Sequence, residues 1–207
     1  MARPTLWHLT HHNNLPLIRQ AKRLFPAAVV APDYIGTVRR GRSVHRGEPV
    51  LRDQDLLHAA CVELSHGWNM EDFLVALASW VFFWSGWPDR PVKPGRNAAR
   101  RYAGTDVIIR VPFGEIATKY EPYFARCNSG ATRMQNGKPV VRGPSAFLKG
   151  KECSYSPSEL VEVTFLGDVG LPSCTEVAHS LDGPWTLLFG SSPNFTSNGR
   201  AEARRST

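Results

Sequence analysis

The sequence predicts an α+β fold, because its helical segments gather early in the chain and strand-like segments follow them. Neither a GxGxxG motif after a strand nor a GxxxxGK[ST] motif is present, so a doubly wound dinucleotide fold and a P-loop fold are not indicated. Hydrophobic residues make up 42% of the 207 residues, which is enough for a packed core. We expect one domain over residues 1–190 and a polar, disordered tail over residues 191–207.

The first elements follow from periodicity and capping residues. Residues 5–10 alternate with aromatic and β-branched content and predict a strand. Asn13 or Asn14 can cap a helix that runs to about Leu24, with Pro16 in its first turn. Residues 26–48 contain prolines, glycines and arginines without a sustained period and predict a loop-rich segment.

The middle of the chain predicts two helices followed by a buried strand. Apolar residues at helical spacing predict a helix over residues 53–65, which Gly67 would end. A second helix begins after Asn69, with an apolar face of Phe73, Leu74 and Leu77. The run WVFFW at residues 80–84 is apolar on both faces, as in a central strand.

The second half of the chain predicts mostly strands. Residues 123–150 are rich in Gly, Asn, Ser and Arg and predict a long irregular loop with a strand piece near Val140. The remaining elements are short helices over 97–102 and 113–120, and strands over 106–111, 160–165 and 185–189.

Composition narrows the class of partner. Lys and Arg number 25 against 18 Asp and Glu, a net charge of +7, which favours nucleic acid, nucleotide phosphates or an anionic surface. No apolar run reaches the ~18 residues of a membrane span, and no signal-peptide core opens the chain, so we expect a soluble, cytoplasmic protein without a membrane partner. The four cysteines lack CxxC or zinc-ligand spacing, so we expect no metal and no disulfide framework.

A first candidate site lies where the first strand meets the first helix. His8 and Thr10 share one strand face, and His11, His12, Asn13 and Asn14 follow in the turn. Unsatisfied backbone N–H groups at a helix start favour small polar ligands. The alternative is a capped turn with solvent-exposed histidines.

A second candidate is Glu162, a carboxylate within the apolar strand ELVEVTF. A buried acid without a partner is costly, so Glu162 either faces solvent or serves chemistry. In the second case it would hold a sugar hydroxyl and stabilise positive charge as a glycosidic bond breaks.

Two arginine-containing segments are further candidates. Residues 39–54 carry Arg42, Arg46 and Arg52, which either are solvated surface charges or clamp a pyrophosphate. Residues 120–133 interleave aromatic and cationic side chains, a composition suited to stacking on a base with phosphate contacts or to ordinary loop packing. The candidates in this second segment are Tyr123, Arg126, Asn128 and Arg133.

The segment HLTHHNNLPLI resembles the opening strand and helix of DarT-type nucleic-acid ADP-ribosyltransferases, whose pattern is H-[IVL]-T-H-x-x-N-[LV]-x-x-I. The matching positions are His8, Thr10, His11, Asn14, Leu15 and Ile18. The segment RSVHRGEPVLRD, the run WVFFW and the strand from Glu162 to Phe165 keep the order of the later family motifs across residues 4–172. The sequence departs from the family at its PRSPMLY motif, where SGWPDRP stands, and in the loop that selects the target.

The resemblance implies a split-sheet ADP-ribosyltransferase fold that uses NAD as co-substrate and no metal. His8, Thr10 and Asn14 would bind NAD, and Glu162 would be the catalytic acid. Arg52 would be the catalytic or phosphate-binding arginine, with Arg42 and Arg46 competing for phosphate contacts. Residues 120–158 would select the acceptor, which the resemblance implies to be a base of DNA or RNA.

Two other functions stay open at this point. The charge and the aromatic–arginine loop also fit a non-catalytic basic nucleic-acid-binding module, and a third possibility is ADP-ribosyl transfer to protein side chains. A toxin of this kind would act with an antitoxin or hydrolase partner that one chain does not reveal.

Overall fold

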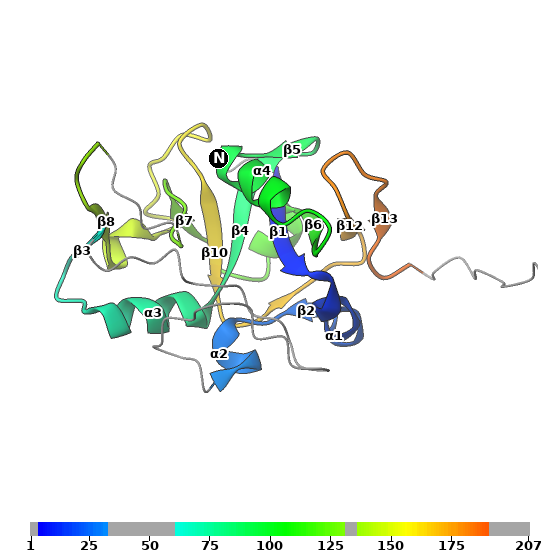
Figure 1. The fold of residues 1–207 in the computed structure, drawn as a ribbon, viewed down its shortest axis with the longest axis horizontal. Helices are drawn as coiled ribbons and strands as arrows, with labels where there is room; N and C mark the ends of the chain where they lie inside the picture. The colour runs from blue at the N-terminus through cyan, green and yellow to red at the C-terminus, as the bar shows by residue number, and fades with distance from the viewer. Residues whose placement is uncertain (1–3, 33–60, 131–135, 191–207) are drawn as a thin grey trace, which may run out of the picture.

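The computed structural model describes residues 4–32, 61–130 and 136–190 (Figure 1). Helices and short strands surround an antiparallel sheet, which confirms the α+β class. In these ranges no helix has both the length and the apolar character needed to cross a bilayer.

Within the described residues the main sheet has nine strands in the order β13-β12-β6-β1-β4-β10-β7-β9, with β5 paired to β4. The order differs from the chain order, so distant segments become neighbours, and every pair in this sheet is antiparallel. The strands are β1 Thr5–His11, β4 Trp80–Trp87, β5 Arg90–Pro91, β6 Asp106–Pro112, β7 Tyr123–Ala125, β9 Leu148–Lys149, β10 Glu162–Leu166, β12 Glu176–Ala178 and β13 Thr186–Leu187.

Helices and two small strand pairs complete the described fold. The pairs are β2 (Arg23–Leu24) with β11 (Val169–Gly170) and β3 (Val62–Leu64) with β8 (Val140–Arg142), and the second pair is parallel. The α-helices are α1 Leu15–Ala21, α2 Ala27–Val30, α3 Met70–Ser79, α4 Lys93–Arg101 and α5 Phe113–Ala117.

Several predicted elements are confirmed. Thr5–His11 forms β1, and the run at 80–84 opens β4, which lies between β1 and β10. Helix α3 begins with a capping box in which Asn69 and Asp72 bond reciprocally, and its predicted apolar residues are buried. Helix α1 starts with Pro16 in its first turn but ends at Ala21, because Lys22 is left-handed (φ 52°) and residues 23–24 pair as β2.

Two predictions at the middle of the chain are wrong. The helix predicted over 53–65 is contradicted at Val62–Leu64, which pairs with Val140–Arg142; residues 53–60 lie outside the described ranges. In the segment 123–150 the strand piece predicted near Val140 is confirmed as β8, but the rest is not one irregular loop, since it also contains β7 and β9. Strands of two or three residues leave no readable alternation, so tertiary pairing decides their conformation.

The two faces of the main sheet carry different cores. One face carries the larger cluster, which includes Leu6, Phe83, Val163 and Phe165. The opposite face carries Trp7, Leu9 and Ile108, and α4 packs there through Ala98, Ala99 and Tyr102.

Strands β1 and β4 pair only at one end. Their register runs from Thr5–Gly86 to Trp7–Trp84. Beyond this point β1 continues along β6 to His11–Asp106, while β4 continues along β10 to Trp80–Leu166. Figure 1 shows β1 running toward α1 and the Trp80 end of β4 lying toward α3. The sheet therefore splits beyond the Trp7–Trp84 pair, between the later residues of β1 and the earlier residues of β4.

Candidate functional site

Glu162 is a buried acid at the start of β10, in the row between Trp84 of β4 and Ala125 of β7. Its side chain points away from solvent, with 3% of the residue exposed, so the solvent-facing interpretation of this position is wrong. Ser129, which follows β7, donates two hydrogen bonds to Oε2 of Glu162, one from its backbone N–H at 2.9 Å and one from its hydroxyl at 2.5 Å. A local donor pair therefore holds one carboxylate oxygen in place.

Arg142 holds the backbone of Ser129, the residue that donates to Glu162. Its Nε donates to the Ser129 carbonyl at 3.4 Å, and its Nη2 donates to the Asn128 carbonyl at 3.2 Å. The residue is only 6% exposed, and no ion pair joins it directly to Glu162 within the described ranges. We call Glu162, Ser129 and Arg142 the acid cluster.

Burial dominates the electrostatics of the acid cluster. Desolvation raises the pKa of Glu162 to about 7, against the lowering effects of the Ser129 hydrogen bonds and of the Arg142 charge. Burial also raises the pKa of the nearby Cys127 thiol, and the Glu162 charge adds to that rise while Arg142 opposes it. Glu162 therefore exchanges its proton near neutral pH, which suits a group that must act as a base or as a charge stabiliser.

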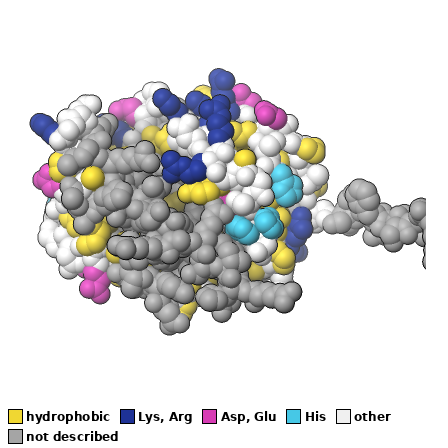
Figure 2. All heavy atoms as spheres, viewed as in Figure 1, with side chains coloured by type: hydrophobic (Ala, Val, Ile, Leu, Met, Phe, Trp, Pro, Cys, Tyr) yellow, Lys and Arg dark blue, Asp and Glu magenta, His cyan; other side chains and the backbone are white. Residues whose placement is uncertain are grey.

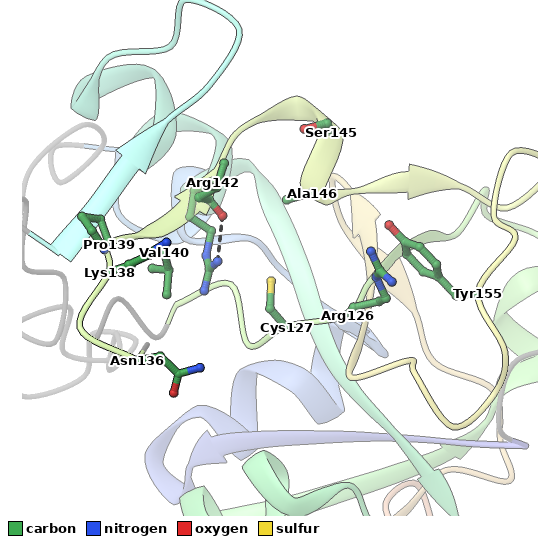
Figure 3. Close-up of a pocket in the computed structure, with 11 residues that line it drawn as sticks. Arg126, Cys127, Asn136, Lys138, Pro139, Val140, Arg142, Ser145, Ala146 and Tyr155 are labelled. Carbon is green, nitrogen blue, oxygen red and sulfur yellow. Dashed lines mark hydrogen bonds between the residues drawn. The ribbon is translucent and has the colours of Figure 1, made fainter. Parts of the chain in front are cut away.

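A pocket of about 610 Å³ adjoins the acid cluster, since it is lined by Arg142 and by Cys127, whose thiol responds to the Glu162 charge. In Figure 3 the Arg142 guanidinium and the Cys127 thiol point into the same space. Arg126 and Lys138 also line the pocket, and no acidic residue does within the described ranges. The pocket wall is therefore positively charged.

A second group of polar side chains lies where β1 ends, and we call His8, Thr10 and Asn14 the junction cluster. Nδ2 of Asn14 donates to Oγ1 of Thr10 at 2.9 Å. Nδ1 of His8 lies 2.8 Å from the Phe82 carbonyl oxygen, so its ring joins β1 to β4 just after their backbone pairing ends. His8 thus occupies the split in the sheet.

The register defines how the two clusters relate. Glu162 pairs with Trp84, which pairs with Trp7, and His8 is the next residue of β1. The backbones of His8 and Glu162 are thus separated by β4, which corresponds to about 10 Å at the usual strand spacing. Because side chains alternate, Glu162 belongs to the face of Trp7 and Trp84, and His8 to the face of Phe83, whose ring it contacts. The register therefore places the side chains of His8 and Glu162 on opposite faces of the sheet.

The other predicted site residues fall into three groups. Arg126 is exposed, lies 4.5 Å over the Tyr155 ring and pairs with Glu159 at 3.3 Å. Tyr123 packs against Trp80, with ring centroids 4.9 Å apart, and Asn128 contributes its carbonyl to Arg142. Four predicted residues lie outside the described ranges, namely Arg42, Arg46, Arg52 and Arg133.

The neighbouring histidines of the motif have local roles. Nδ1 of His11 accepts a hydrogen bond from the Asn13 backbone N–H at 3.2 Å and so caps the short 3-10 helix His12–Asn14. Nδ1 of His12 lies 2.7 Å from the Thr105 carbonyl oxygen, and the two imidazole rings stack. These contacts fit the capped-turn interpretation for His11 and His12.

Basic side chains also gather on the face that carries Glu162. Helix α4 packs on that face through its contact with the Trp7 and Trp84 cluster, and Gly95 allows its close approach to Trp84. Figure 2 shows Lys and Arg side chains gathered over α4 and β5. The exposed ones on these elements are Arg90, Lys93, Arg100 and Arg101.

Sequence reasoning missed Ser129 and Arg142. The usable signal was the cost of burying Glu162, which requires donors from elsewhere in the chain. Ser129, the donor, and Arg142, which supports it, both lie in the segment assigned to target selection, but nothing in its local pattern distinguishes them from the other polar residues there.

Comparisons with known proteins place the chain in a family. The model of a family described as "Family of unknown function (DUF7002)" matches residues 4–174, so the chain belongs to this family. No curated protein matches the chain. Among solved structures, DarT of Thermus sp. 2.9 in complex with NAD+ is similar with a TM-score of 0.38 and 12% identity, covering 81% of this chain and 77% of that one.

Proposed function

We propose that this member of the DUF7002 family is an NAD-dependent mono-ADP-ribosyltransferase whose acceptor is a nucleic acid, most directly a base of DNA or RNA. The observation that carries the proposal is the acid cluster: a buried, donor-held carboxylate one strand away from the split between β1 and β4. The resemblance of residues 8–18 to the opening motif of DarT-type enzymes supports the choice of NAD.

Glu162 would act on the ribose that carries nicotinamide. The C1′–N bond breaks and its electron pair leaves with neutral nicotinamide, so the ribose gains oxocarbenium character. An ionised Glu162 stabilises that positive charge and orients a ribose hydroxyl. The acceptor then forms a new bond to C1′, and its proton passes to Glu162 or to water. The titration range of Glu162 near neutrality fits both duties.

The junction cluster would hold the nicotinamide end of NAD. His8 lies in the split, where the β1 and β4 backbones no longer pair with each other and its ring reaches the Phe82 carbonyl oxygen. Thr10 and Asn14 hold each other at the start of α1, beside the nicotinamide end. Because His8 and Glu162 alternate in side-chain direction, NAD would have to reach His8 through the split while its ribose faces Glu162. An arginine of residues 42–52 would bind the diphosphate. Of these arginines, we propose Arg52 as the catalytic one.

The acceptor would enter from the basic side of Glu162. Arg126, Lys138 and Arg142 line the pocket next to the acid cluster, and the exposed cations of α4 and β5 lie on the same face of the sheet. Such a distribution attracts a polyanion and tracks its backbone. Tyr123, Arg126, Asn128 and Arg133 would then contact the acceptor.

The test combines three readouts on the whole chain. NAD should raise the melting temperature, because a ligand that binds the native state stabilises it. Nicotinamide should appear during incubation, and mass spectrometry of added DNA, RNA and protein should show an ADP-ribose adduct on nucleic acid. Glu162→Gln serves as the matched control, since it keeps the shape of the side chain. Absence of both the thermal shift and nicotinamide release would refute the proposal.

A non-catalytic nucleic-acid-binding module is the second candidate, and the basic surface over α4 and β5 favours it. Salt-sensitive binding of DNA or RNA without any response to NAD would select this function. An adduct on protein side chains instead would retain the enzyme and change its acceptor.

A further inference from the structure

We propose that Ser129 and Arg142 form a positioning clamp that fixes one carboxylate oxygen of Glu162 and favours its ionised form during transfer. The inference rests on the proposed function, because it assigns a purpose to the orientation of the catalytic acid. Neither residue belongs to the motif that suggested the activity.

The contact between Ser129 and Glu162 fixes the position of the acid. Both donors of Ser129 converge on Oε2 of Glu162, at 2.9 Å from the backbone N–H and 2.5 Å from the hydroxyl. Ser129 is 1% exposed, so water does not compete for these bonds. Two donors on one oxygen fix the carboxylate plane and favour negative charge on it. The other oxygen, Oε1, accepts no hydrogen bond from the residues that the structure describes.

Arg142 holds the backbone segment that carries the two donors of Ser129. Its guanidinium donates to the carbonyl oxygens of Asn128 and of Ser129, which carries both donors to Glu162. A planar fork that binds two successive carbonyls restrains the peptide between them. The guanidinium also brings a positive charge near Glu162, which lowers the pKa of that acid against the effect of burial.

Arg142 is itself held in place by its backbone contacts. Its backbone lies in β8, where it pairs with Leu64 of β3. Ser65 donates to the Arg142 carbonyl oxygen twice, from its N–H at 2.9 Å and from its hydroxyl at 3.2 Å. The small β3–β8 pair, which contributes nothing to the main sheet, thereby becomes the support of the acid.

The groups that face Glu162 define what its titration can report. Among the described residues, Arg142 and the Cys127 thiol are the ionisable neighbours that act on or respond to its charge, and Arg126 acts on Cys127 from the outer wall of the pocket. The Cys127 thiol stays neutral where Glu162 titrates, because burial raises its pKa. Arg126 is exposed and already paired with Glu159. Loss of Arg126 therefore tests long-range charge without disturbing the clamp.

The experiment measures the Glu162 carboxyl directly by NMR, in protein labelled with carbon-13 at glutamate side chains, with Glu162→Gln identifying the signal. Ser129→Ala should raise the midpoint by about one pH unit, since it removes a hydrogen bond to a charged group. Arg142→Gln should also raise it, by a smaller amount, because the Arg142 charge lowers the pKa of Glu162 less than the Ser129 hydrogen bonds do. Ser145→Ala, an exposed serine of the same pocket, and Arg126→Gln should leave it nearly unchanged.

Nicotinamide release supplies the second readout. The acidic limb of the pH–rate profile should move upward with the NMR midpoint, so that Ser129→Ala loses about tenfold at low pH and recovers at high pH. A merely structural defect would lower the rate equally at every pH. An unchanged midpoint in Ser129→Ala overturns the clamp. If Arg142→Gln does not fold, the result for Ser129→Ala alone decides the proposal. If Arg142→Gln behaves like Arg126→Gln, Arg142 has no part in it. Shifted midpoints without NAD consumption by the wild type would retain the effect on charge but refute the proposed function.

Discussion

The acid cluster and the junction cluster lie on either side of β4, yet they are assembled in opposite ways. The junction cluster comes from residues 8–14, a single strand end and the turn after it. The acid cluster joins three separate elements, since Ser129 follows β7, Arg142 ends β8 and Glu162 begins β10. One cluster is local and partly exposed, and the other is nonlocal and buried.

This difference separates two ways of placing polar groups in a fold. In the junction cluster, short-range bonds such as Asn14 to Thr10 cost little to arrange, because both partners lie within one strand end and its turn. In the acid cluster, a charge is taken out of water, and its donors must be supplied by chain segments that fold around it. We therefore expect the acid cluster to be sensitive to substitution in both rate and stability, and the junction cluster to affect mainly ligand binding.

The largest effect is expected from Glu162→Gln on turnover. The amide cannot carry the negative charge that stabilises an oxocarbenium-like ribose, so kcat for nicotinamide release should fall about 10³-fold. KM for NAD should change little, because the side chain keeps its size. Steady-state kinetics with purified protein measure both constants. A kcat within threefold of the wild type would remove Glu162 from the reaction.

The next effect is a pH-dependent stability that Glu162 imposes on the wild type. Its pKa is about 7 in the folded protein, above the ordinary value of 4.5 expected when unfolded. Between these values the native state keeps a proton that the unfolded chain has lost, so the free energy of unfolding falls as pH rises and levels off above about 7. The loss is about 3 kcal/mol. Urea unfolding at pH 5 and pH 8 should show it in the wild type relative to Glu162→Gln; equal slopes in both proteins would contradict it.

The sequence predicted what is encoded locally. β1, α3 and the central strand follow from alternation, capping and a continuous apolar run, and the structure has all three. The importance of Glu162 was also readable, because an acid in an apolar strand requires an explanation. What the sequence could not supply was its environment. β3, β7 and β8 are three residues long and pair across more than twenty positions, so no local pattern marks them.

Strand register limited the prediction in a second way. His8 and Glu162 were expected to act on one NAD molecule, but their relative side-chain direction depends on how β4 aligns with each neighbour. A shift of one residue in either pairing would reverse a face. Sequence alone does not specify that shift, whereas the structure gives both registers.

A smaller effect is expected at His8. His8→Ala removes the ring that joins β1 to β4 at the split, and the loss of about one hydrogen bond to NAD should raise KM about tenfold. kcat should fall much less than in Glu162→Gln, because the acid cluster is left intact. The exposed His179 provides a control, since His179→Ala should leave both constants unchanged. A fall in kcat comparable to that of Glu162→Gln would place His8 in catalysis and would end the contrast between the two clusters.

The smallest effect is expected from Asn14→Ala on stability. This change removes the hydrogen bond to Oγ1 of Thr10 and should lower the free energy of unfolding by about 1 kcal/mol. Asn97→Ala, on the exposed side of α4, should be neutral or slightly stabilising because alanine favours a helix. Urea unfolding of the three proteins compares them directly. A cost well above that of a single hydrogen bond would mean that the junction cluster, like the acid cluster, supports the fold around it, since local bonds alone would not account for such a loss.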